Sequence, residues 1–463
     1  MPRILRQIAL AAVTATALAT AGCGFGAPAT TAAPSAPVAR APELAPDQPV
    51  SLVFESYNLG QAGPWSDTFT ELLDQFHAEH PNITVTAQKP QGASSNPAAD
   101  AVSSVQTQLS TGTAPDVVQL GFSDMAFTVD QLRAKPLDDL VGADTVQAHF
   151  DAGHPFAPTA RTLAQVDGRT YGIPFVFSTP MLYLNATLFA QAGLDPATPP
   201  TTWDEVRRAA LAIRAATGKD GAYVDCVTTT AKDWCLQSIV RSNGGRVLSE
   251  DGARLTYAEP PAVEAVAMLQ DLVTSGAAPK LTQQQAVEAF TRGDLGMVLE
   301  SSSVQGTFAE GAAGAGWQLT GTAVPSFGDR PAVPTNSGAA LYVISDDPAR
   351  QRAAWELITF LTSDRAYTLI AQKIGYLPLR TGLVDDPAAL RSWAAQNPTV
   401  GINVAQLDRM EPWVAFPGDD YLQIRDGMMD AVERVVLQGA DPATTLAEAQ
   451  QRGTALMPAQ NGR

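Results

Sequence analysis

The chain combines an acidic composition with a length that exceeds one ordinary core. Its 463 residues include 30 Lys and Arg against 47 Asp and Glu, which gives a net charge of −17 at pH 7. Because such a surface repels phosphate backbones, we expect no binding to nucleic acid.

The N-terminal residues have the layout of a secretory signal. Arg3 and Arg6 precede an apolar stretch from Ile8 to Ala21, which is too short to span a bilayer comfortably. Residues 24–48 are almost all Ala, Pro, Thr, Ser and Gly, a composition that cannot bury a core and is typical of a flexible tether. We therefore expect a signal peptide over residues 1–23 and a tether over 24–48, followed by two lobes.

The segment before Cys23 resembles a lipobox, in which the cysteine is acylated and becomes the mature N-terminus. The motif is Thr20-Ala21-Gly22-Cys23, and it departs from the usual pattern at Thr20, where leucine is preferred. The resemblance implies lipidation of Cys23 and anchoring to the outer face of the cell membrane. In such an oxidising setting we expect Cys226 and Cys235 to form a disulfide, with two buried free thiols as the alternative.

The first folded segment alternates strands and helices. Strands are expected over residues 51–56, around Ile83 and Val85, and over 116–120, with helices at 65–76 and 98–110 between them. This βαβαβ order predicts a mostly parallel sheet covered by helices. Ligands bind beyond the carboxyl ends of such strands, so Phe122 and Asp124 are candidate contacts. A polar loop with one packed aromatic side chain explains them equally well.

Two later strands stop at clustered hydroxyl groups. The strand that ends at Phe177 is followed by Ser178-Thr179-Pro180, and the proline forces a new pairing from Met181 onward. The strand over 295–299 ends at Glu300-Ser301-Ser302-Ser303. We interpret both breaks as crossovers between lobes, with Ser178 and Ser301 at one cleft. An edge kink and a serine-rich surface loop are the alternatives.

Four further residues are candidate ligand contacts. Gly338 would let a ligand approach the backbone closely, and Tyr376 stands where a helix ends. Trp234 would be a flat platform for a polyol or a choline-like group, although a lone tryptophan is more often part of a core. Arg425 lies on the apolar stripe of a helix over 420–437 and needs an anion, which is either a ligand or a structural carboxylate.

Several helix boundaries have strong local signals. Helices are expected over 203–217, 261–274, 283–291 and 348–361, with a second helix after the last of these that runs to Lys373. Thr202 and Glu205 form a capping-box pattern before the first of these helices.

The order of these motifs resembles the extracytoplasmic solute-binding proteins of ABC importers, in sugar-binding family 1. Five motifs show this resemblance: the Ser-Thr-Pro crossover, the Ala-Gly-Leu-Asp-Pro loop before Pro-x-Thr-Trp, the Gly-Asp-x-x-Met strand with its serines, the Gly-Tyr-Leu-Pro corner and the Gln-Ile-Arg helix. They are most similar to the branch that binds glycerol-3-phosphate and glycerophosphodiesters.

This resemblance implies an α/β, two-lobed periplasmic-binding-protein fold with hinge crossovers. We expect residues 49–177 with 303–346 in the first lobe, and 178–302 with 347–463 in the second. The residues that match the glycerol-phosphate site of the branch are Ser178, Ser301, Gly338, Tyr376 and Arg425, and Trp234 matches its aromatic platform. Ala98 and Phe122 depart from a tyrosine and an acidic residue of the family pattern, and Asp124 is a possible replacement for the acid.

Enzyme signatures are missing from the sequence. It has no G-x-x-x-x-G-K-[ST] loop and no G-x-S-x-G elbow, and His77-Ala78-Glu79-His80 is not a zinc motif. We expect no catalysis, metal or cofactor, but a monomeric receptor that closes on a small polar solute and presents it to a membrane permease. The alternatives are a receptor for a neutral sugar or disaccharide and a secreted hydrolase that uses a carboxylate pair such as Asp419 or Asp420 with Glu411.

Overall fold

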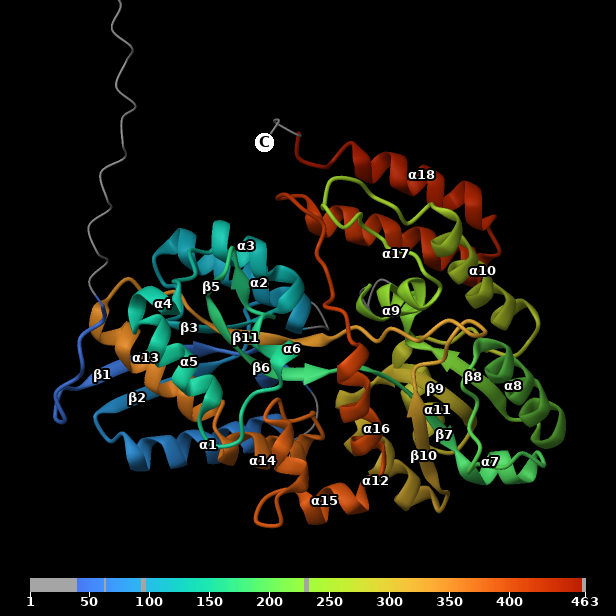
Figure 1. The fold of residues 1–463 in the computed structure, drawn as a ribbon, viewed down its shortest axis with the longest axis horizontal. Helices are drawn as coiled ribbons and strands as arrows, with labels where there is room; N and C mark the ends of the chain where they lie inside the picture. Colours follow the sequence, from blue (N-terminus) through green and yellow to red (C-terminus); the bar gives the residue numbers. More distant parts are fainter. Residues whose placement is uncertain (1–39, 62–63, 93–96, 229–232, 460–463) are drawn as a thin grey trace, which may run out of the picture. The chain divides into compact units, whose positions relative to one another are not determined.

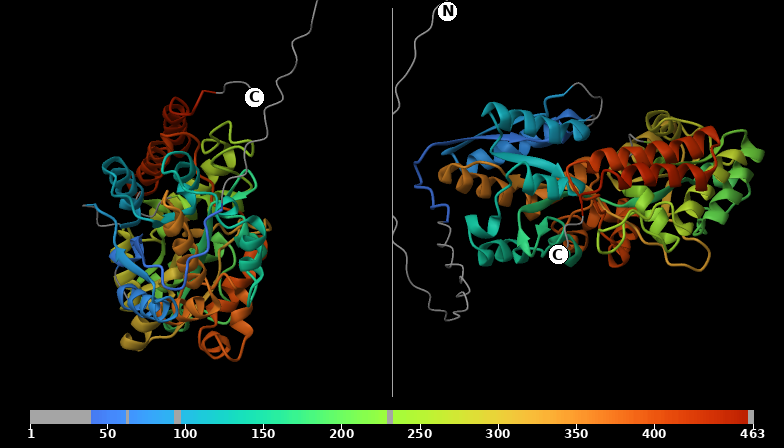
Figure 2. Two further views of the ribbon diagram at one scale, coloured as in Figure 1. Left: turned by 90° about the vertical axis from the view of Figure 1, so that its left-hand side faces the viewer. Right: turned by 90° about the horizontal axis from the view of Figure 1, so that it is seen from above.

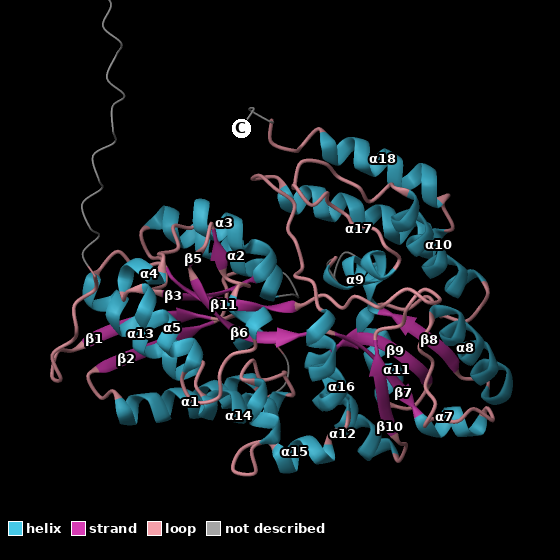
Figure 3. Cartoon of the chain, viewed as in Figure 1, coloured by secondary structure: helices cyan, strands magenta, loops and turns pink. Residues whose placement is uncertain are grey.

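The computed structural model describes residues 40–61, 64–92, 97–228 and 233–459 (Figure 1). The expected signal peptide, the expected lipidation site Cys23 and most of the expected tether lie outside the described residues. Figure 3 shows that the described strands form two main sheets, each with its own helices. None of the helices in this part of the chain combines the length and the hydrophobicity that crossing a membrane requires.

The first sheet has the strand order β2-β1-β3-β11-β6. Strand β1 pairs in parallel with β2 and β3, as the βαβαβ pattern predicts, but β11 is antiparallel to both β3 and β6. The sheet is therefore mixed, and its one antiparallel strand, β11, comes late in the sequence. The bounds are β1 Val50–Glu55, β2 Ile83–Gln88, β3 Val117–Gly121, β6 Gly172–Ser178 and β11 Ser337–Val343.

Helices pack their apolar residues against this sheet and define the first lobe. Leu52 and Phe54 of β1 share one core with Phe69 of α1 and Leu357 of α13. The helices are α1 Trp65–Glu79, α2 Pro97–Thr111, α3 Met125–Asp130, α4 Leu137–Leu140, α5 Ala143–Asp151, α6 Pro158–Arg161, α13 Pro348–Leu361, α14 Asp364–Ile374 and α15 Arg391–Gln396. A small hairpin of β4 (Gln165–Val166) and β5 (Arg169–Thr170) turns at Asp167-Gly168.

The second sheet has the order β10-β7-β9-β8 and carries the second lobe. Strand β7 is antiparallel to both of its neighbours, and β8 runs parallel to β9. The strands are β7 Pro180–Asn185, β8 Asp220–Val224, β9 Leu295–Ser301 and β10 Leu319–Ala323. The helices are α7 Ala186–Gln191, α8 Trp203–Thr217, α9 Trp234–Ser242, α10 Pro260–Thr274, α11 Gln283–Thr291, α12 Gln305–Ala315, α17 Tyr421–Gln438 and α18 Pro442–Thr454. The last two are the red helices that lie side by side in Figure 2.

The capping box before α8 is formed as expected. The Thr202 side chain accepts from the Glu205 amide, and the Glu205 carboxylate accepts from the Thr202 amide. Two orphan amides of the first helical turn are thus satisfied, which explains why α8 begins at Trp203.

The crossover at the Ser-Thr-Pro break is confirmed. Strand β6 belongs to the first sheet and β7 to the second, and only Thr179 separates them. Thr179 is fully buried, and its hydroxyl donates to Asn403 of α16 (Thr399–Gln406). Its amide donates to the Ser302 hydroxyl, at 3.2 Å, and its carbonyl accepts from the Ser302 amide, at 3.0 Å. The two serine-rich breaks are therefore bonded to each other.

The membership of five elements differs from the expected lobe boundaries. Strand β10 and helix α12, within the 303–346 segment expected in the first lobe, belong to the second, because β10 pairs with β7 and Phe308 of α12 packs against Phe290 of α11. The return crossing expected at Ser301 therefore lies after β10. Helices α13, α14 and α15, expected in the second lobe, pack side chains such as Trp355, Tyr367 and Trp393 in or against the first core. Their apolar stripes complete the cover of the first sheet, which the strand and helix patterns alone do not specify.

The tether was expected to extend to residue 48, but its last part packs against the first lobe. The Ala41 amide donates to the Leu140 carbonyl at 2.9 Å, and Glu43 pairs with Arg352 at 2.6 Å. Ala41 is buried and Leu44 packs against the first core, so these residues belong to the lobe.

Candidate ligand-binding site

Asp124 is bonded across the junction of the two lobes. It ends the short 3₁₀ helix η2 (Phe122–Asp124), which follows β3 of the first sheet, and is 4% exposed. Its Oδ1 accepts from the Tyr421 hydroxyl of α17 at 2.8 Å. A Cβ at Gly121 would lie 2.8 Å from Asp124 Oδ2, so the glycine makes room for this carboxylate. The candidate Asp124 therefore meets the second lobe directly.

Arg425 lies one helical turn after Tyr421 on α17. Its Nε and one terminal nitrogen donate to Asp426 Oδ1, at 2.9 and 2.8 Å, and 12% of its side chain is exposed. Burial alone would lower the pKa of Arg425, but the carboxylates of Asp426, Asp233 and Asp124 together raise it. The guanidinium is therefore charged and held among three acidic side chains.

Asp233, one of these three acidic residues, is hydrogen-bonded to Trp413. Trp413 Nε1 donates to Asp233 Oδ1 at 3.0 Å, and Gln237 donates to Asp233 Oδ2 at 2.7 Å. Burial raises the pKa of Asp233 above its usual value. The Trp413 amide donates to Asn336 Oδ1 at 2.8 Å, while Asn336 Nδ2 is buried without a hydrogen-bond partner in the described part of the chain.

The expected disulfide is present, and Trp234 lies beside it. Cys226 and Cys235 are bonded, with their Cα atoms 5.2 Å apart. Trp234, at the start of α9, is 5% exposed and belongs to the second core. Its carbonyl accepts from Thr335, which precedes the buried Asn336. The structure thus gives Trp234 a packing role and leaves a stacking role as a proposal.

A second polar group gathers around Tyr376. The αL residue Gly375 ends α14 and turns the chain so that Tyr376 is buried. Burial raises the pKa of Tyr376 to about 12, and the side chains of Ser303 and Asn58 act on it in the opposite direction. The hydroxyls of Ser301 and Ser303 lie 2.7 Å apart.

Tyr57 lies between the two polar groups. Burial raises its pKa well above the usual value, and the electrostatic influence of both Tyr376 and Asp124 acts on its hydroxyl. Ser178 is paired with Ser337 in the first sheet and is 2% exposed. The structure therefore brings Asp124, Tyr376, Ser301 and Arg425 toward one junction, whereas Ser178 is a strand residue there.

Two sequence candidates have a structural explanation that involves no ligand. Gly338 has φ of +125°, and a Cβ there would lie 2.0 Å from the Val176 carbonyl oxygen, so the close approach of β11 and β6 itself requires glycine. Phe122 is 5% exposed and packs in the first core. Ala98, the other departure from the family pattern, is half-buried near the start of α2.

Three site residues were not predicted from the sequence, namely Tyr421, Trp413 and Asn336. Each makes its contact with a residue far away along the chain, so no local spacing marks it. The one available signal was the position of Tyr421 four residues before Arg425, which places both on the same face of α17.

A pocket opens where the lobes meet at Tyr421. Its walls come from η2, from α3, from the loop before α17 and from the first residue of α17. They include the aromatic side chains Phe127, Phe416 and Tyr421, the hydroxyl of Ser123, and the carboxylates Asp130 and Asp419. The rings of Phe127 and Tyr421 lie 5.7 Å apart, and Gln131 donates to Asp419 at 3.2 Å across the junction.

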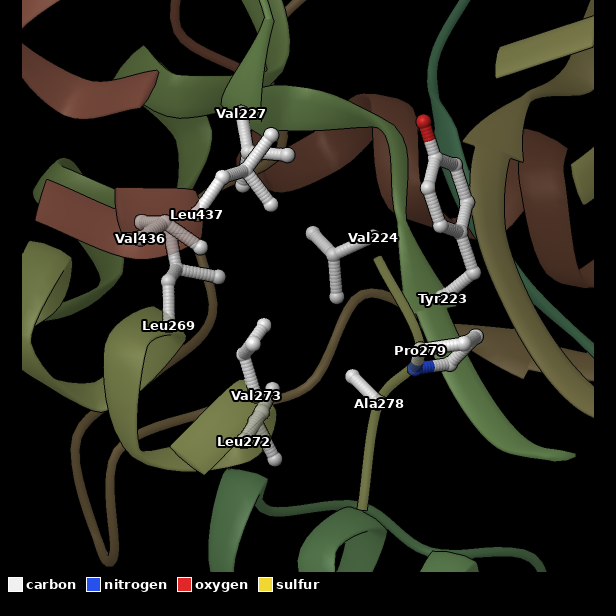
Figure 4. A pocket seen from close by; sticks show the side chains of 10 residues that line it. All are labelled: Tyr223, Val224, Val227, Leu269, Leu272, Val273, Ala278, Pro279, Val436 and Leu437. Carbon is white, nitrogen blue, oxygen red and sulfur yellow. The ribbon is translucent and has the colours of Figure 1, made fainter. Parts of the chain in front are cut away.

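A second pocket lies within the second lobe (Figure 4). Its lining is apolar apart from Tyr223, with side chains such as Val224, Leu269 and Val436 pointing inward. It offers few groups for orienting a polar solute, so the pocket at the lobe junction is the better candidate.

Comparisons with known proteins agree with this architecture. Residues 62–368 match the family model of bacterial extracellular solute-binding proteins. The sn-glycerol-3-phosphate-binding periplasmic protein UgpB of Pectobacterium atrosepticum is 26% identical over 403 residues, covering 83% of this chain and 87% of the relative.

Two solved structures share the fold. UgpB from Mycobacterium tuberculosis, in complex with glycerophosphocholine, has a TM-score of 0.74 and 23% identity, covering 88% of this chain and 98% of the other. The cyclic alpha-maltosyl-1,6-maltose binding protein from Arthrobacter globiformis has a TM-score of 0.72 and 22% identity, covering 88% and 99%. These relatives and neighbours are binding proteins and not enzymes. The chain belongs to the bacterial extracellular solute-binding proteins, the binding components of ABC importers.

Proposed function

We propose that this protein captures a glycerol-phosphate-type solute, namely glycerol-3-phosphate or a glycerophosphodiester such as glycerophosphocholine, and delivers it to its permease. The observation that carries the proposal is the charged guanidinium of Arg425 at the lobe junction, beside the cross-lobe bond of Asp124. An arginine fork matches two phosphate oxygens in one plane. The glycerol-3-phosphate-binding relative supports the same choice of ligand.

Ligand binding at Arg425 requires an exchange of anions. In this structure the fork of Arg425 is bonded to Asp426, whose side chain is 51% exposed. Because Asp426 is half exposed, water can solvate its carboxylate when a phosphate takes its place at the largely buried Arg425. The freed carboxylate would turn into solvent.

The surrounding charges favour a diester over a monoester. A phosphate monoester carries about −1.5 to −2 charges near neutral pH, whereas a diester carries one. Asp233 and Asp124 repel either anion, and the repulsion grows with its charge. The carboxylates Asp130 and Asp419 and three aromatic rings line the adjoining pocket, which suits a polar or cationic head group on the far side of the diester.

A neutral sugar is the second candidate, and the same charges support it. Three carboxylates already act on Arg425, so the site balances its positive charge without any ligand. Aromatic walls also suit the faces of sugar rings. The maltosyl-maltose-binding neighbour adds an analogy of fold alone.

The proposal includes an anchor and a mode of action. We infer that Cys23 carries a lipid that tethers a monomeric receptor to the outer face of the membrane. Closure of the lobes around the solute would be favoured by contacts that form only in the closed state, with Asp124 and Tyr376 on one side and α17 and the crossovers on the other. Mass spectrometry of membrane-associated protein tests the anchor, because an unmodified Cys23 contradicts it.

Isothermal titration of the protein without its signal peptide tests the ligand. We expect binding of glycerophosphocholine or glycerol-3-phosphate, and Arg425→Ala should weaken it about 30-fold or more, since losing one partner of a buried charge contact costs about 2–5 kcal/mol. Arg434→Ala, on the same helix, is the matched control and should bind like the parent. Equal binding by Arg425→Ala would show that no phosphate clamp exists, and binding of maltose alone would establish the sugar candidate.

A further inference from the structure

Two buried carboxyl groups face each other at the end of the second sheet. Strands β8 and β9 run parallel with Val224 opposite Leu299, so the next residues, Asp225 and Glu300, are neighbours. Their exposed fractions are 1% and 2%. The side chain of Gln283 contacts both carboxyl groups, so they lie in one polar environment. Two ionised carboxylates side by side in a buried position repel each other, which favours a proton on one of them.

The other contacts of the pair are all neutral donors. Gln283 of α11 donates to Asp225 Oδ2 at 2.9 Å and to Glu300 Oε2 at 3.3 Å. The Ser301 amide donates to Glu300 Oε1 at 2.7 Å, and the Tyr223 hydroxyl of β8 donates to Asp225 Oδ1 at 3.4 Å. None of these partners brings a positive charge that would balance two carboxylates.

Among the described residues, two phenols are titratable groups that face the pair. Burial, followed by the charges of Asp225 and Glu300, raises the pKa of Tyr223, and burial with the charge of Glu300 raises that of Tyr183 on β7. Both phenols are therefore neutral across the range in which carboxyl groups titrate. Burial, followed by the charge of Glu300, raises the pKa of Asp225 well above its usual value, and burial raises that of Glu300. Carboxyl groups this close titrate as a unit.

Both carboxyl groups adjoin segments of the proposed ligand site. Glu300 holds the amide of Ser301, whose hydroxyl contacts Ser303 beside Tyr376. Asp225 precedes Cys226, and the disulfide to Cys235 connects it to the segment that carries Trp234 and Asp233. Any movement between the ends of β8 and β9 therefore reaches both sides of the site.

We propose that Asp225 and Glu300 share one proton that holds the ends of β8 and β9 together, and that loss of this proton at alkaline pH weakens ligand binding. A second negative charge in this buried position repels the first and separates the Ser301 segment from the disulfide segment. The effect on affinity rests on the proposed ligand site, whereas the shared proton does not.

The pH dependence has a definite sign. Carboxyl groups in the unfolded chain titrate near about pH 4. Above that pH the native pair retains a proton that the unfolded chain has lost, so the native state binds more protons. The free energy of unfolding therefore falls as the pH rises from about 4 through the raised pKa of the pair.

Asp225→Asn tests the shared proton without any ligand, because the amide keeps the shape and can donate to Glu300. Glu310→Gln is the matched control, since Glu310 is an exposed carboxylate on α12. From about pH 6 to about pH 9, the thermal midpoint of the parent and of the control should fall more steeply than that of Asp225→Asn. Glu300→Gln serves as the second variant if Asp225→Asn does not fold. Equal pH slopes in all variants would overturn the proposal.

Infrared spectroscopy detects the proton directly. The parent should show the carbonyl band of a buried protonated carboxyl group near neutral pH, and Asp225→Asn should lack it. Absence of this band from the parent would also overturn the proposal.

Titration with glycerophosphocholine tests the coupling, because its net charge does not change between about pH 6 and about pH 9 as that of a phosphate monoester does. The affinity of the parent should fall about tenfold, which corresponds to a difference of about one unit between the pKa of the pair in the free and in the ligand-bound protein. The affinity of Asp225→Asn should change clearly less. Equal changes in both proteins would refute the coupling. A parent that does not bind this probe contradicts the proposed ligand instead, and the midpoint and infrared results still decide on the shared proton.

Discussion

Removing the hydroxyl of Tyr421 tests the contact that joins the two lobes. In Tyr421→Phe, Asp124 Oδ1 loses its donor at 2.8 Å, and among the described residues the Ser123 hydroxyl, at 3.4 Å, remains. The carboxylate remains 4% exposed, so water can replace the lost donor only poorly. A hydrogen bond to a charged group contributes about 1.5–3 kcal/mol, and we expect the free energy of unfolding to fall by that amount.

Tyr367→Phe is the matched comparison within the same molecule. The Tyr367 hydroxyl donates to the neutral carbonyl of Pro174 at 2.7 Å, inside the first lobe, and is equally buried. Bonds to neutral acceptors contribute about 0.5–1.5 kcal/mol, so this variant should lose about half as much. Urea-induced unfolding followed by circular dichroism measures both. If Tyr421→Phe is no less stable than Tyr367→Phe, the reasoning about a charged bond across the junction is wrong.

Two further predictions concern backbone geometry and a buried histidine. Gly338→Ala should lower the free energy of unfolding by about 2–5 kcal/mol, since its Cβ would lie 2.0 Å from the Val176 carbonyl oxygen at a φ of +125°. Gly314→Ala, in open space on α12, should raise it by about 0.5–1 kcal/mol, and the same effect at both sites would contradict the steric argument. Burial, with the charge of Arg380, lowers the pKa of His149 to about 3. The unfolded chain therefore binds an extra proton as the pH falls below about 6.5. At about pH 5 this lowers the free energy of unfolding of the parent by about 2 kcal/mol relative to neutral pH. His149→Gln should not show this loss. Urea midpoints at the two pH values measure the difference, and identical losses in parent and variant would rule it out.

Local signals in the sequence predicted most of the elements. The capping box placed the start of α8 at Trp203, and the Ser-Thr-Pro break located the crossover between sheets, because both depend on neighbouring residues. The motif order also predicted the family. What local patterns could not supply was the partner of each element, so β10 and the helices α12, α13, α14 and α15 were assigned to the wrong lobe.

The candidate site was harder to predict for the same reason. Asp124 and Arg425 could be named as polar residues at promising positions, but the Tyr421 bond to Asp124 spans 297 positions along the chain. Sequence spacing also cannot distinguish a ligand contact from a packing requirement. Gly338, for example, fits the family motif, and the close approach of β6 at Val176 also requires a glycine at this position.

The place of β11 in the first sheet has a consequence for how the chain folds. This strand, Ser337–Val343, lies between β3 and β6, although the whole of the second sheet precedes it in the chain. The first lobe therefore cannot close its sheet until nearly three quarters of the polypeptide has been made, about the fraction that residue 343 marks. Pairings over such distances form slowly. A partly synthesised chain, which still has a gap between β3 and β6, remains unfolded for longer. A protein must be in this unfolded state if it is to be threaded through a membrane before it matures.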